Sequence, residues 1–141
     1  KHMDPPTCVF IFAGYELQME EFMKVNQGLG RRVQYRYKFS PYALNELMQI
    51  FVKMCENKEE KLATGAEQKC VELLSSLPSS VLEQHNAGLI GNLLHHSTLQ
   101  RDERIPLAEA AANPGLCCIL EPVDIQNGFE LLKSSLCLPV T

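Results

Sequence analysis

The sequence lacks the features that would place it in a non-globular class. No apolar run approaches the roughly 18 residues of a membrane-spanning helix. No basic N-terminal segment leads into an apolar stretch with a small-residue cleavage site, so no signal peptide is visible. The 141 residues are 45% hydrophobic and only 21% charged, which is too apolar for a disordered chain. We therefore expect a globular chain with a buried core.

The sequence also lacks the cysteine spacing of a disulfide framework or a zinc site. Its six cysteines are irregularly spaced, and Cys8, Cys55 and Cys70 lie within apolar patterns. We expect reduced cysteines in the core, because a free cysteine packs like a small hydrophobic residue. Disulfides are the open alternative. The neighbouring pairs Cys117-Cys118 and His95-His96 are poor zinc chelates, since adjacent helical residues point about 100° apart. No metal is expected.

Acidic residues are missing from one stretch of the chain. Between Phe22 and Asn45 there is no aspartate or glutamate, although the whole chain has a formal net charge of −4. The same stretch holds five cations, namely Lys24, Arg31, Arg32, Arg36 and Lys38. The sequence thus predicts a local basic face on an acidic protein, and a solvated surface is its simplest interpretation.

Two segments near the start have the patterns of strands. Residues 8–13 form a continuous apolar run, which is typical of a strand buried on both faces of a parallel sheet. Residues 33–39 alternate between apolar and polar side chains, which predicts a half-buried strand. Between them, residues 16–25 have a helical pattern and the glycines of Asn26–Gly30 favour a loop.

The remainder of the sequence predicts helices. One is expected to start at Ser40-Pro41, with Ser as N-cap, Pro at the first helical position and a hydrophobic staple between Phe39 and Leu44. Others are expected at about residues 65–76, 86–101 and 106–113 and from Glu121-Pro122 onward. The predicted fold class is mostly α with a small β component.

Three segments in this order resemble a known family. They are Gly14-Tyr15 with Met19 to Phe22, then Asn26 to Val33, and then Phe39 to Phe51. Their order and spacing resemble the second half of an AAA+ ATPase module. The branch is that of stage V sporulation protein K and the red-type rubisco activases, which are CbbX-like proteins. The resemblance extends through a helix start at Asn86-Ala87 and covers nearly the whole chain.

The resemblance implies a division of the chain. Residues 1–3 are expected to be a cloning scar, residues 4–39 the C-terminal remnant of the large α/β subdomain, and residues 40–141 the small helical lid. The remnant would hold the last two strands of the α/β core, and in the family another strand lies between them. Unpaired strand edges seek partners, so we expect dimerisation, strand exchange or non-native sheet closure.

The resemblance also implies site residues. Arg32, with Arg31 beside it, stands where the family has an arginine finger that acts in trans on the γ-phosphate of a neighbouring subunit. Arginine suits this role because its planar, permanently charged group matches phosphate oxygens. Asn86, Ala87 and Gly88 stand at the lid sensor position, where Gly88 replaces an arginine that contacts nucleotide. A solvated turn is the alternative interpretation of Arg31 and Arg32.

The implied function is that of the C-terminal portion of an AAA+ ATPase module from an ATP-dependent protein-remodelling ring. The sequence contains neither a phosphate loop, GxxxxGK(S/T), nor the family's acidic strand end for magnesium. ATP and Mg are therefore expected in an intact parent protein, none is expected bound to this chain, and the chain alone should not hydrolyse ATP. The expected partners are further copies and a protein client, without a membrane. The expected location is intracellular, with the cytoplasm favoured.

Two other functions stay open at this point. The glycine at position 88 favours a degenerate, non-catalytic AAA+-like scaffold or interaction module. The cations between Lys24 and Lys38 also admit nucleic-acid binding, but the acidic net charge and the lack of a nucleic-acid motif weigh against it.

Overall fold

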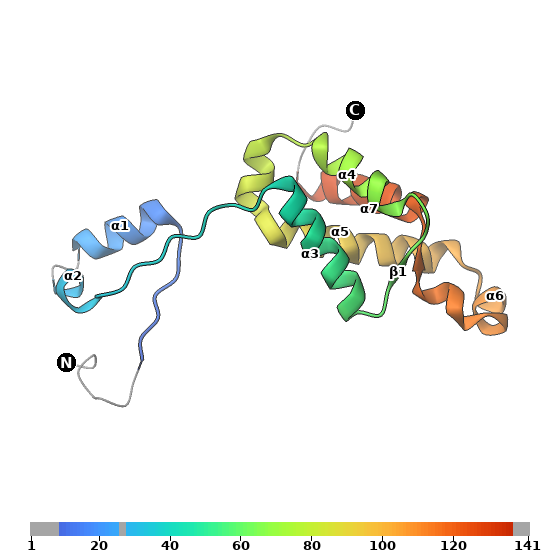
Figure 1. Cartoon of the computed structure of the whole chain (residues 1–141), viewed down its shortest axis with the longest axis horizontal. Coiled ribbons are helices and arrows are strands. Elements are labelled where there is room, and N and C mark those ends of the chain that lie inside the picture. Colours follow the sequence, from blue (N-terminus) through green and yellow to red (C-terminus); the bar gives the residue numbers. More distant parts are fainter. Residues whose placement is uncertain (1–8, 26–27, 137–141) are drawn as a thin grey trace. The chain divides into compact units, whose positions relative to one another are not determined.

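The computed structural model describes residues 9–25 and 28–136 (Figure 1). Contacts within the chain divide it into two units, residues 1–40 and residues 41–141. None of the helices in the described parts is both long enough and apolar enough to cross a membrane.

The first unit consists of two short helices and extended segments. Its helices, α1 (Glu16–Val25) and α2 (Leu29–Arg32), bury no residue. The rings of Phe12 and Phe22 lie 5.9 Å apart between centroids. The Nζ atom of Lys38 lies 2.7 Å from a carboxylate oxygen of Glu16, but both side chains are exposed. Such a pair adds little stability. None of the described residues of this unit is buried, so they form no core of their own.

The strands predicted at residues 8–13 and 33–39 are not formed. Residue 8 lies outside the described residues, while residues 9–13 and 33–39 pair with no described strand. Most of their apolar side chains face solvent, with Ile11 86% and Phe39 92% exposed. The physical reason is that a strand needs a neighbour to pair its N–H and C=O groups. No described segment supplies one.

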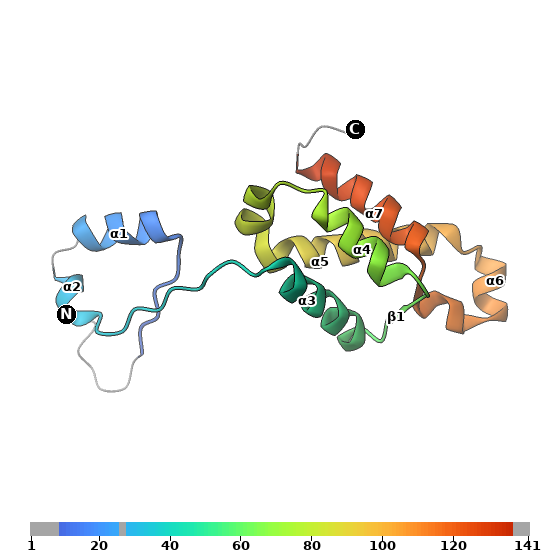
Figure 2. The same cartoon turned by 45° about the horizontal axis from the view of Figure 1, so that its top comes forward.

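The second unit is a helical bundle with one short parallel sheet (Figure 2). In the sheet, β1 (Lys61–Leu62) pairs with β2 (Ile119–Leu120). The predicted class, mostly α with a small β component, is confirmed, although these strands are not the ones predicted. The helices are α3 (Leu44–Asn57), α4 (Ala66–Ser75), α5 (Ser79–Arg104), α6 (Leu107–Ala112), a 3₁₀ helix (Pro114–Cys118) and α7 (Pro122–Ser135).

The core of the second unit lies among α3, α4, α5 and α7. Phe51 on α3, Ile90 on α5 and Leu132 on α7 are fully buried. The helices α5 and α7 approach closely because α7 carries Gly128 at the contact. A Cβ atom there would lie only 2.6 Å from the backbone nitrogen of Ser97. The core is thus built from the apolar faces that the helical periodicity predicts.

The start of α3 is at Leu44, and the predicted start at Ser40-Pro41 is wrong. Ala43 is the N-cap, with an extended backbone, and its N–H donates a hydrogen bond of 2.7 Å to the carboxylate of Glu46. The N–H of Tyr42 donates to a side chain of α5. These two hydrogen bonds satisfy the backbone N–H groups of Tyr42 and Ala43 while the chain there is extended. The helix therefore begins only after these residues.

The other predicted helices are confirmed, with shifted ends for some. Both α4 and α6 lie within one residue of their predicted bounds. In α7, Pro122 occupies the first turn and Asp124 accepts a hydrogen bond of 2.8 Å from the N–H of Glu121, which caps the helix. The helix α5 is longer than predicted because a first segment from Ser79 precedes the expected start at residue 86.

Candidate functional site

Arg31 and Arg32 lie at the end of α2, which occupies part of the loop predicted at Asn26–Gly30. Residues 26 and 27 of that loop lie outside the described residues. Both arginine side chains are exposed, and neither forms an ion pair with a described residue. The helix has four residues and ends at Val33, where the chain becomes extended. Two permanent positive charges are therefore presented to solvent side by side.

A kink interrupts α5 at Asn86. The backbone there has φ 50° and ψ −134°, a conformation that is strained for a residue with a side chain. The Oδ1 atom of Asn86 accepts a hydrogen bond of 3.0 Å from the N–H of Tyr42. This bond ties the segment before α3 to the kink. It offsets part of the strain and holds the break between the two parts of α5.

Ala87 and Gly88 begin the second part of α5, which runs to Arg104. Ala87 is half-buried and Gly88 is exposed. A Cβ atom on Gly88 would meet no atom within 4 Å, so the space for a larger side chain is open. The first arginine of α5 is Arg101. The resemblance expects an arginine at position 88, and the first turns of this segment contain no other lysine or arginine that could replace it.

The predicted site residues form two groups. Arg31 and Arg32 lie together on α2 in the first unit, and Asn86, Ala87 and Gly88 lie together on α5 in the second. Within the described ranges, no group of three or more histidine, cysteine, aspartate or glutamate side chains could hold a metal ion. Neither group is by itself a complete site for nucleotide and magnesium.

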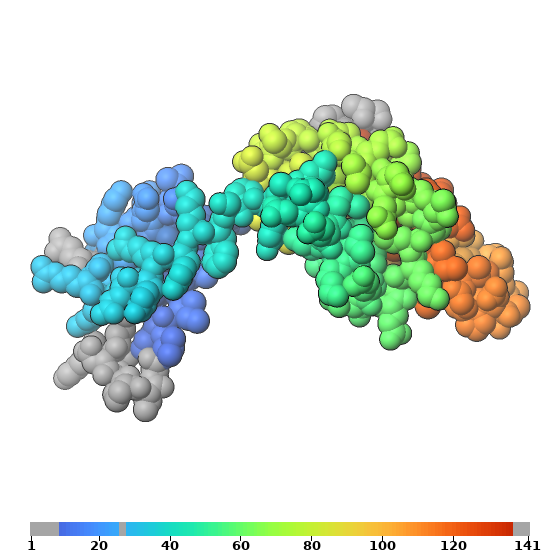
Figure 3. Space-filling view, in the orientation of Figure 1, coloured from blue at the N-terminus to red at the C-terminus, as the bar shows by residue number. Residues whose placement is uncertain are grey.

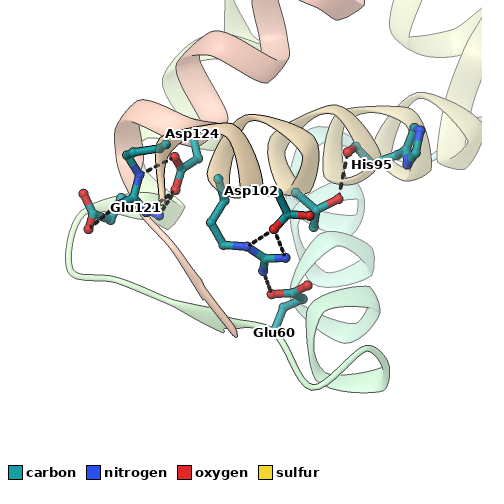
Figure 4. Close-up of polar contacts among 8 residues, drawn as sticks. Glu60, His95, Asp102, Glu121 and Asp124 are labelled. Carbon is teal, nitrogen blue, oxygen red and sulfur yellow. Dashed lines mark hydrogen bonds and ion pairs between the residues drawn. The ribbon is translucent and has the colours of Figure 1, made fainter. Parts of the chain in front are cut away.

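An arginine cluster at the end of α5 was missed by the sequence reasoning (Figure 4). Arg101 is 6% exposed and forms ion pairs with Glu60 and Asp102. Burial alone would lower the pKa of Arg101, but a hydrogen bond to Asp102 and the charges of Glu60 and Asp102 outweigh it and raise this pKa. The guanidinium thus joins α5 to the turn that follows α3.

Arg104 makes a second connection, from α5 to α7. Its Nε and Nη2 atoms lie 2.8 Å and 2.9 Å from the two carboxylate oxygens of Asp124, a bidentate pair. Asp124 is 1% exposed, and the hydrogen bond it accepts raises the pKa of Arg104. A sequence signal for this cluster exists, because Arg101 follows the inward position Ser97 at helical spacing. The cluster connects α5 to α7 and to the turn after α3.

Two of the cysteines predicted to lie in the core are found there. Cys55 and Cys70 are free and buried. Burial raises the pKa of Cys55 to about 11 and that of Cys70 to about 12, so both are protonated thiols at neutral pH. Cys117 is half-buried, Cys118 is exposed, and both are free. The other two cysteines lie outside the described residues.

Comparisons with known proteins find the same family that the motifs suggest. The family model of the AAA lid domain matches residues 43–135. The chain is 28% identical to stage V sporulation protein K of Bacillus subtilis over 113 residues, which cover 77% of this chain and 35% of that protein. It is 30% identical to a CfxQ homolog of Trieres chinensis over 97 residues, 69% of this chain and 33% of the relative. It is also 30% identical to the ESX-3 secretion system protein EccA3 of Mycobacterium leprae over 83 residues, 59% and 13% respectively.

The extent of these matches agrees with the fold. The family match begins at the N-cap of α3 and ends with the last residue of α7, so it covers the helical bundle of the second unit. The chain spans about a third of the length of stage V sporulation protein K and of the CfxQ homolog. The chain therefore belongs to the AAA lid domain family of the AAA+ ATPases, in the branch of stage V sporulation protein K and the CfxQ proteins.

Proposed function

We propose that the chain is the lid-bearing part of an AAA+ ATPase module in an ATP-dependent protein-remodelling ring. The observation that carries this proposal is the family match over the whole bundle from α3 to α7. Residues 40–141 act as the small helical lid, and residues 4–39 as the end of the large α/β subdomain. Because the sequence holds neither a phosphate loop nor the family's acidic strand end for magnesium, this chain alone does not hydrolyse ATP, and ATP and Mg belong to an intact parent.

Within that module, Arg32 acts as the arginine finger, with Arg31 beside it. Two observations support this role: both side chains are exposed, and no described carboxylate neutralises them. Arginine at this place stabilises the charge that develops on a phosphoryl group held by a neighbouring copy. The role requires self-association into a ring, and the substrate of the ring is a protein client.

Asn86, Ala87 and Gly88 form the part of the lid that faces nucleotide. The kink at Asn86 starts a new helical segment, and the start of such a segment favours an anion. The hydrogen bond between Asn86 and Tyr42 couples this segment to the connection between the two units. The exposed Gly88 supplies no positive charge, so this lid contributes less to nucleotide binding than one that carries arginine there.

A chimera tests the finger. The chain replaces the corresponding third of Bacillus subtilis stage V sporulation protein K, and ATP hydrolysis by the purified chimera is measured. Arg32→Ala should lower kcat by about a thousandfold, because removing an arginine finger has effects of that size. Arg36→Ala is the matched control, since Arg36 is also exposed and without an ion pair among the described residues. Equal losses in both variants would contradict the assignment.

A non-catalytic scaffold is the second candidate, and Gly88 is the observation that favours it. The same chimera separates the two functions. A scaffold would assemble and fold normally, yet hydrolyse ATP no faster than background. Gly88→Arg should then restore hydrolysis, because the space around a side chain at this position is open. A chimera that already turns over with Gly88 in place would exclude the scaffold.

A further inference from the structure

The backbone N–H of Tyr42 can be accepted by either of two side chains of this protein. In the structure it donates to Oδ1 of Asn86 at 3.0 Å, which joins the segment before α3 to the kink of α5. The space-filling view shows that segment beside the first part of α5 (Figure 3). The hydroxyl of Ser40 becomes the second acceptor if α3 begins at Pro41. We propose that the exchange between these two acceptors is a conformational switch at the start of the helical bundle.

In the first state, which the structure shows, α3 is short and α5 is bent. Of the backbone N–H groups just before α3, that of Tyr42 is the one bonded to α5, because Pro41 has no N–H and Ala43 donates to Glu46. The bond to Asn86 lies at the surface. A neutral hydrogen bond at such a place adds little net stability, so it exchanges readily for another of the same kind.

The bent form of α5 has a backbone cost at Asn86. Its φ of 50° and ψ of −134° are accessible to glycine and strained for asparagine. The first segment of α5, residues 79–85, departs from the axis of the rest of the helix (Figure 2). Leu82 is the residue of this segment that packs against the core, and all the others except the half-buried Val81 are exposed. Little therefore holds the bend against the strain.

In the second state, α3 begins at Pro41. Ser40 is then the N-cap and Tyr42 the second helical residue, whose N–H an N-cap serine accepts. Pro41 takes the first helical position, where its fixed φ suits the helix and its missing N–H costs nothing. Phe39, which is 92% exposed in the structure, then packs against Leu44 as a hydrophobic staple. The start signals before α3 that the structure leaves unused are all used in this state.

The same exchange straightens α5. Among the described residues, the side chain of Asn86 makes no other hydrogen bond, so release of Tyr42 leaves the strained backbone without its polar support. Asn86 then takes the helical conformation, and residues 79–104 form one continuous helix. Because one N–H cannot serve both acceptors, a partner that fixes either helix also sets the other. The switch involves neither nucleotide nor Arg32, so it holds or fails independently of the ATPase function.

Backbone NMR of the full chain tests the switch. The ¹³Cα chemical shifts of residues 41–43 and 86 distinguish helical from extended backbone, and amide exchange of Tyr42 shows whether its N–H is bonded. Asn86→Ala removes the acceptor and disfavours positive φ. The helical population of residues 41–43 should rise at least about tenfold, roughly the effect of one N-cap. Exchange at Tyr42 should stay within about threefold of the parent, because Ser40 becomes the acceptor.

Two further variants separate the switch from a simple gain in helix propensity. Asn92→Ala is the matched control, since Asn92 is exposed on α5 and the same replacement there leaves Tyr42 untouched. It should leave residues 41–43 extended. In Ser40→Ala/Asn86→Ala both acceptors are removed, and exchange at Tyr42 should be at least about tenfold faster than in the parent.

The reverse direction is tested from α3. Ala43→Glu places a glutamate three residues after Ser40, which completes a capping box for the longer α3. It should make residue 86 helical, although the substitution lies in a different element. Ala43→Lys cannot complete the box and should leave residue 86 as it is. Unchanged shifts of the buried residues Phe51 and Leu132 verify that each variant is folded.

Either of two results would overturn the proposal. Exchange at Tyr42 that is as fast in Asn86→Ala as in the double variant would show that Ser40 never accepts this N–H. Residues 41–43 that become helical in Ala43→Glu while residue 86 keeps its shift would show that the two helices change independently.

Discussion

The two units of this chain use the same residue types in opposite ways. Phe51 in the second unit is fully buried, whereas Phe39 in the first is 92% exposed. Arg101 in the second unit is buried between carboxylates, whereas Arg31 in the first is exposed and without an ion pair among described residues. For these residues, the environment differs because the second unit supplies packing or charged partners, whereas the described part of the first unit does not.

This difference indicates which elements can fold without further parts of the protein. Each long amphipathic helix of the second unit covers the apolar face of another, so the bundle has its own core. The extended segments of the first unit cannot pair without further strands, and its helices bury nothing. We expect the second unit to carry nearly all of the free energy of unfolding. The self-association predicted from the unpaired segments stays a prediction.

Truncation of one phenylalanine in each unit should show the largest difference in stability between the two units. Phe51→Ala should lower the free energy of unfolding by about 3–5 kcal/mol, because it leaves a cavity in the bundle. Phe39→Ala should change it by less than about 0.5 kcal/mol, as an exposed substitution does. Urea unfolding followed by far-UV circular dichroism gives both values. A large loss from Phe39→Ala would show that residues 33–39 are packed in solution.

Removal of an arginine from each unit has the next largest expected effect. Arg101→Met should cost about 3 kcal/mol, since it leaves the carboxylate of Glu60 without its partner in a nearly dry site. Arg36→Met is the control in the first unit, where the side chain is exposed, and should be neutral within about 0.5 kcal/mol. The same urea titrations measure both. If Arg101→Met is as stable as the parent, the ion pairs at the end of α5 contribute nothing net.

A methyl group added to one glycine in each unit gives a smaller contrast. Gly128→Ala should destabilise by about 1–3 kcal/mol, because the new Cβ atom overlaps the backbone of α5 at Ser97. Gly30→Ala lies in α2, where a Cβ atom meets nothing within 4 Å, and should be neutral or slightly stabilising. Thermal unfolding of the two variants compares them directly. Equal midpoints would mean that α7 can move away from α5 at little cost.

Most of the second unit could be predicted from the sequence because helical periodicity depends on local spacing. The apolar stripe through Phe51 and Cys55 and the proline start at Pro122 were both sufficient to place a helix. In the first unit the helical pattern at residues 16–25 also placed α1 correctly, but the predicted strands did not form. The apolar run at residues 8–13 specifies a strand only if neighbouring strands exist, and none is described. The staple expected at Phe39 failed for a different reason: α3 begins at Leu44 with Ala43 as its N-cap, so Phe39 lies too far before the helix and faces solvent.

The candidate site was predictable only through the resemblance. Arg31, Arg32 and Gly88 carry no local signal that separates a functional side chain from a solvated one, and their roles stay proposals. The kink at Asn86 was missed as a kink because its cause lies 44 residues away, at the N–H of Tyr42. A shallow groove between α3 and α4, lined by Met48, Val52 and Val71 among others, was also missed, because it depends on how two amphipathic helices pack and sequence spacing does not determine that.

Alkaline pH should have the smallest effect on stability, and this effect comes from two buried thiols in the core of the second unit. In the unfolded chain, the thiols of Cys55 and Cys70 ionise near the ordinary pKa of 9.0, whereas in the folded chain burial holds their pKa values at about 11 and 12. Raised folded pKa values mean that the unfolded state releases protons first. The contribution of these two thiols to the free energy of unfolding should therefore be constant below about pH 8 and fall as pH rises toward 11, with a loss of about 1 kcal/mol near pH 9. Replacement by Cys70→Ala should roughly halve this pH dependence in urea titrations at several pH values, while Cys118→Ala, at an exposed thiol, should leave it unchanged. An equal pH dependence in all three proteins would mean that the core thiols ionise as readily folded as unfolded.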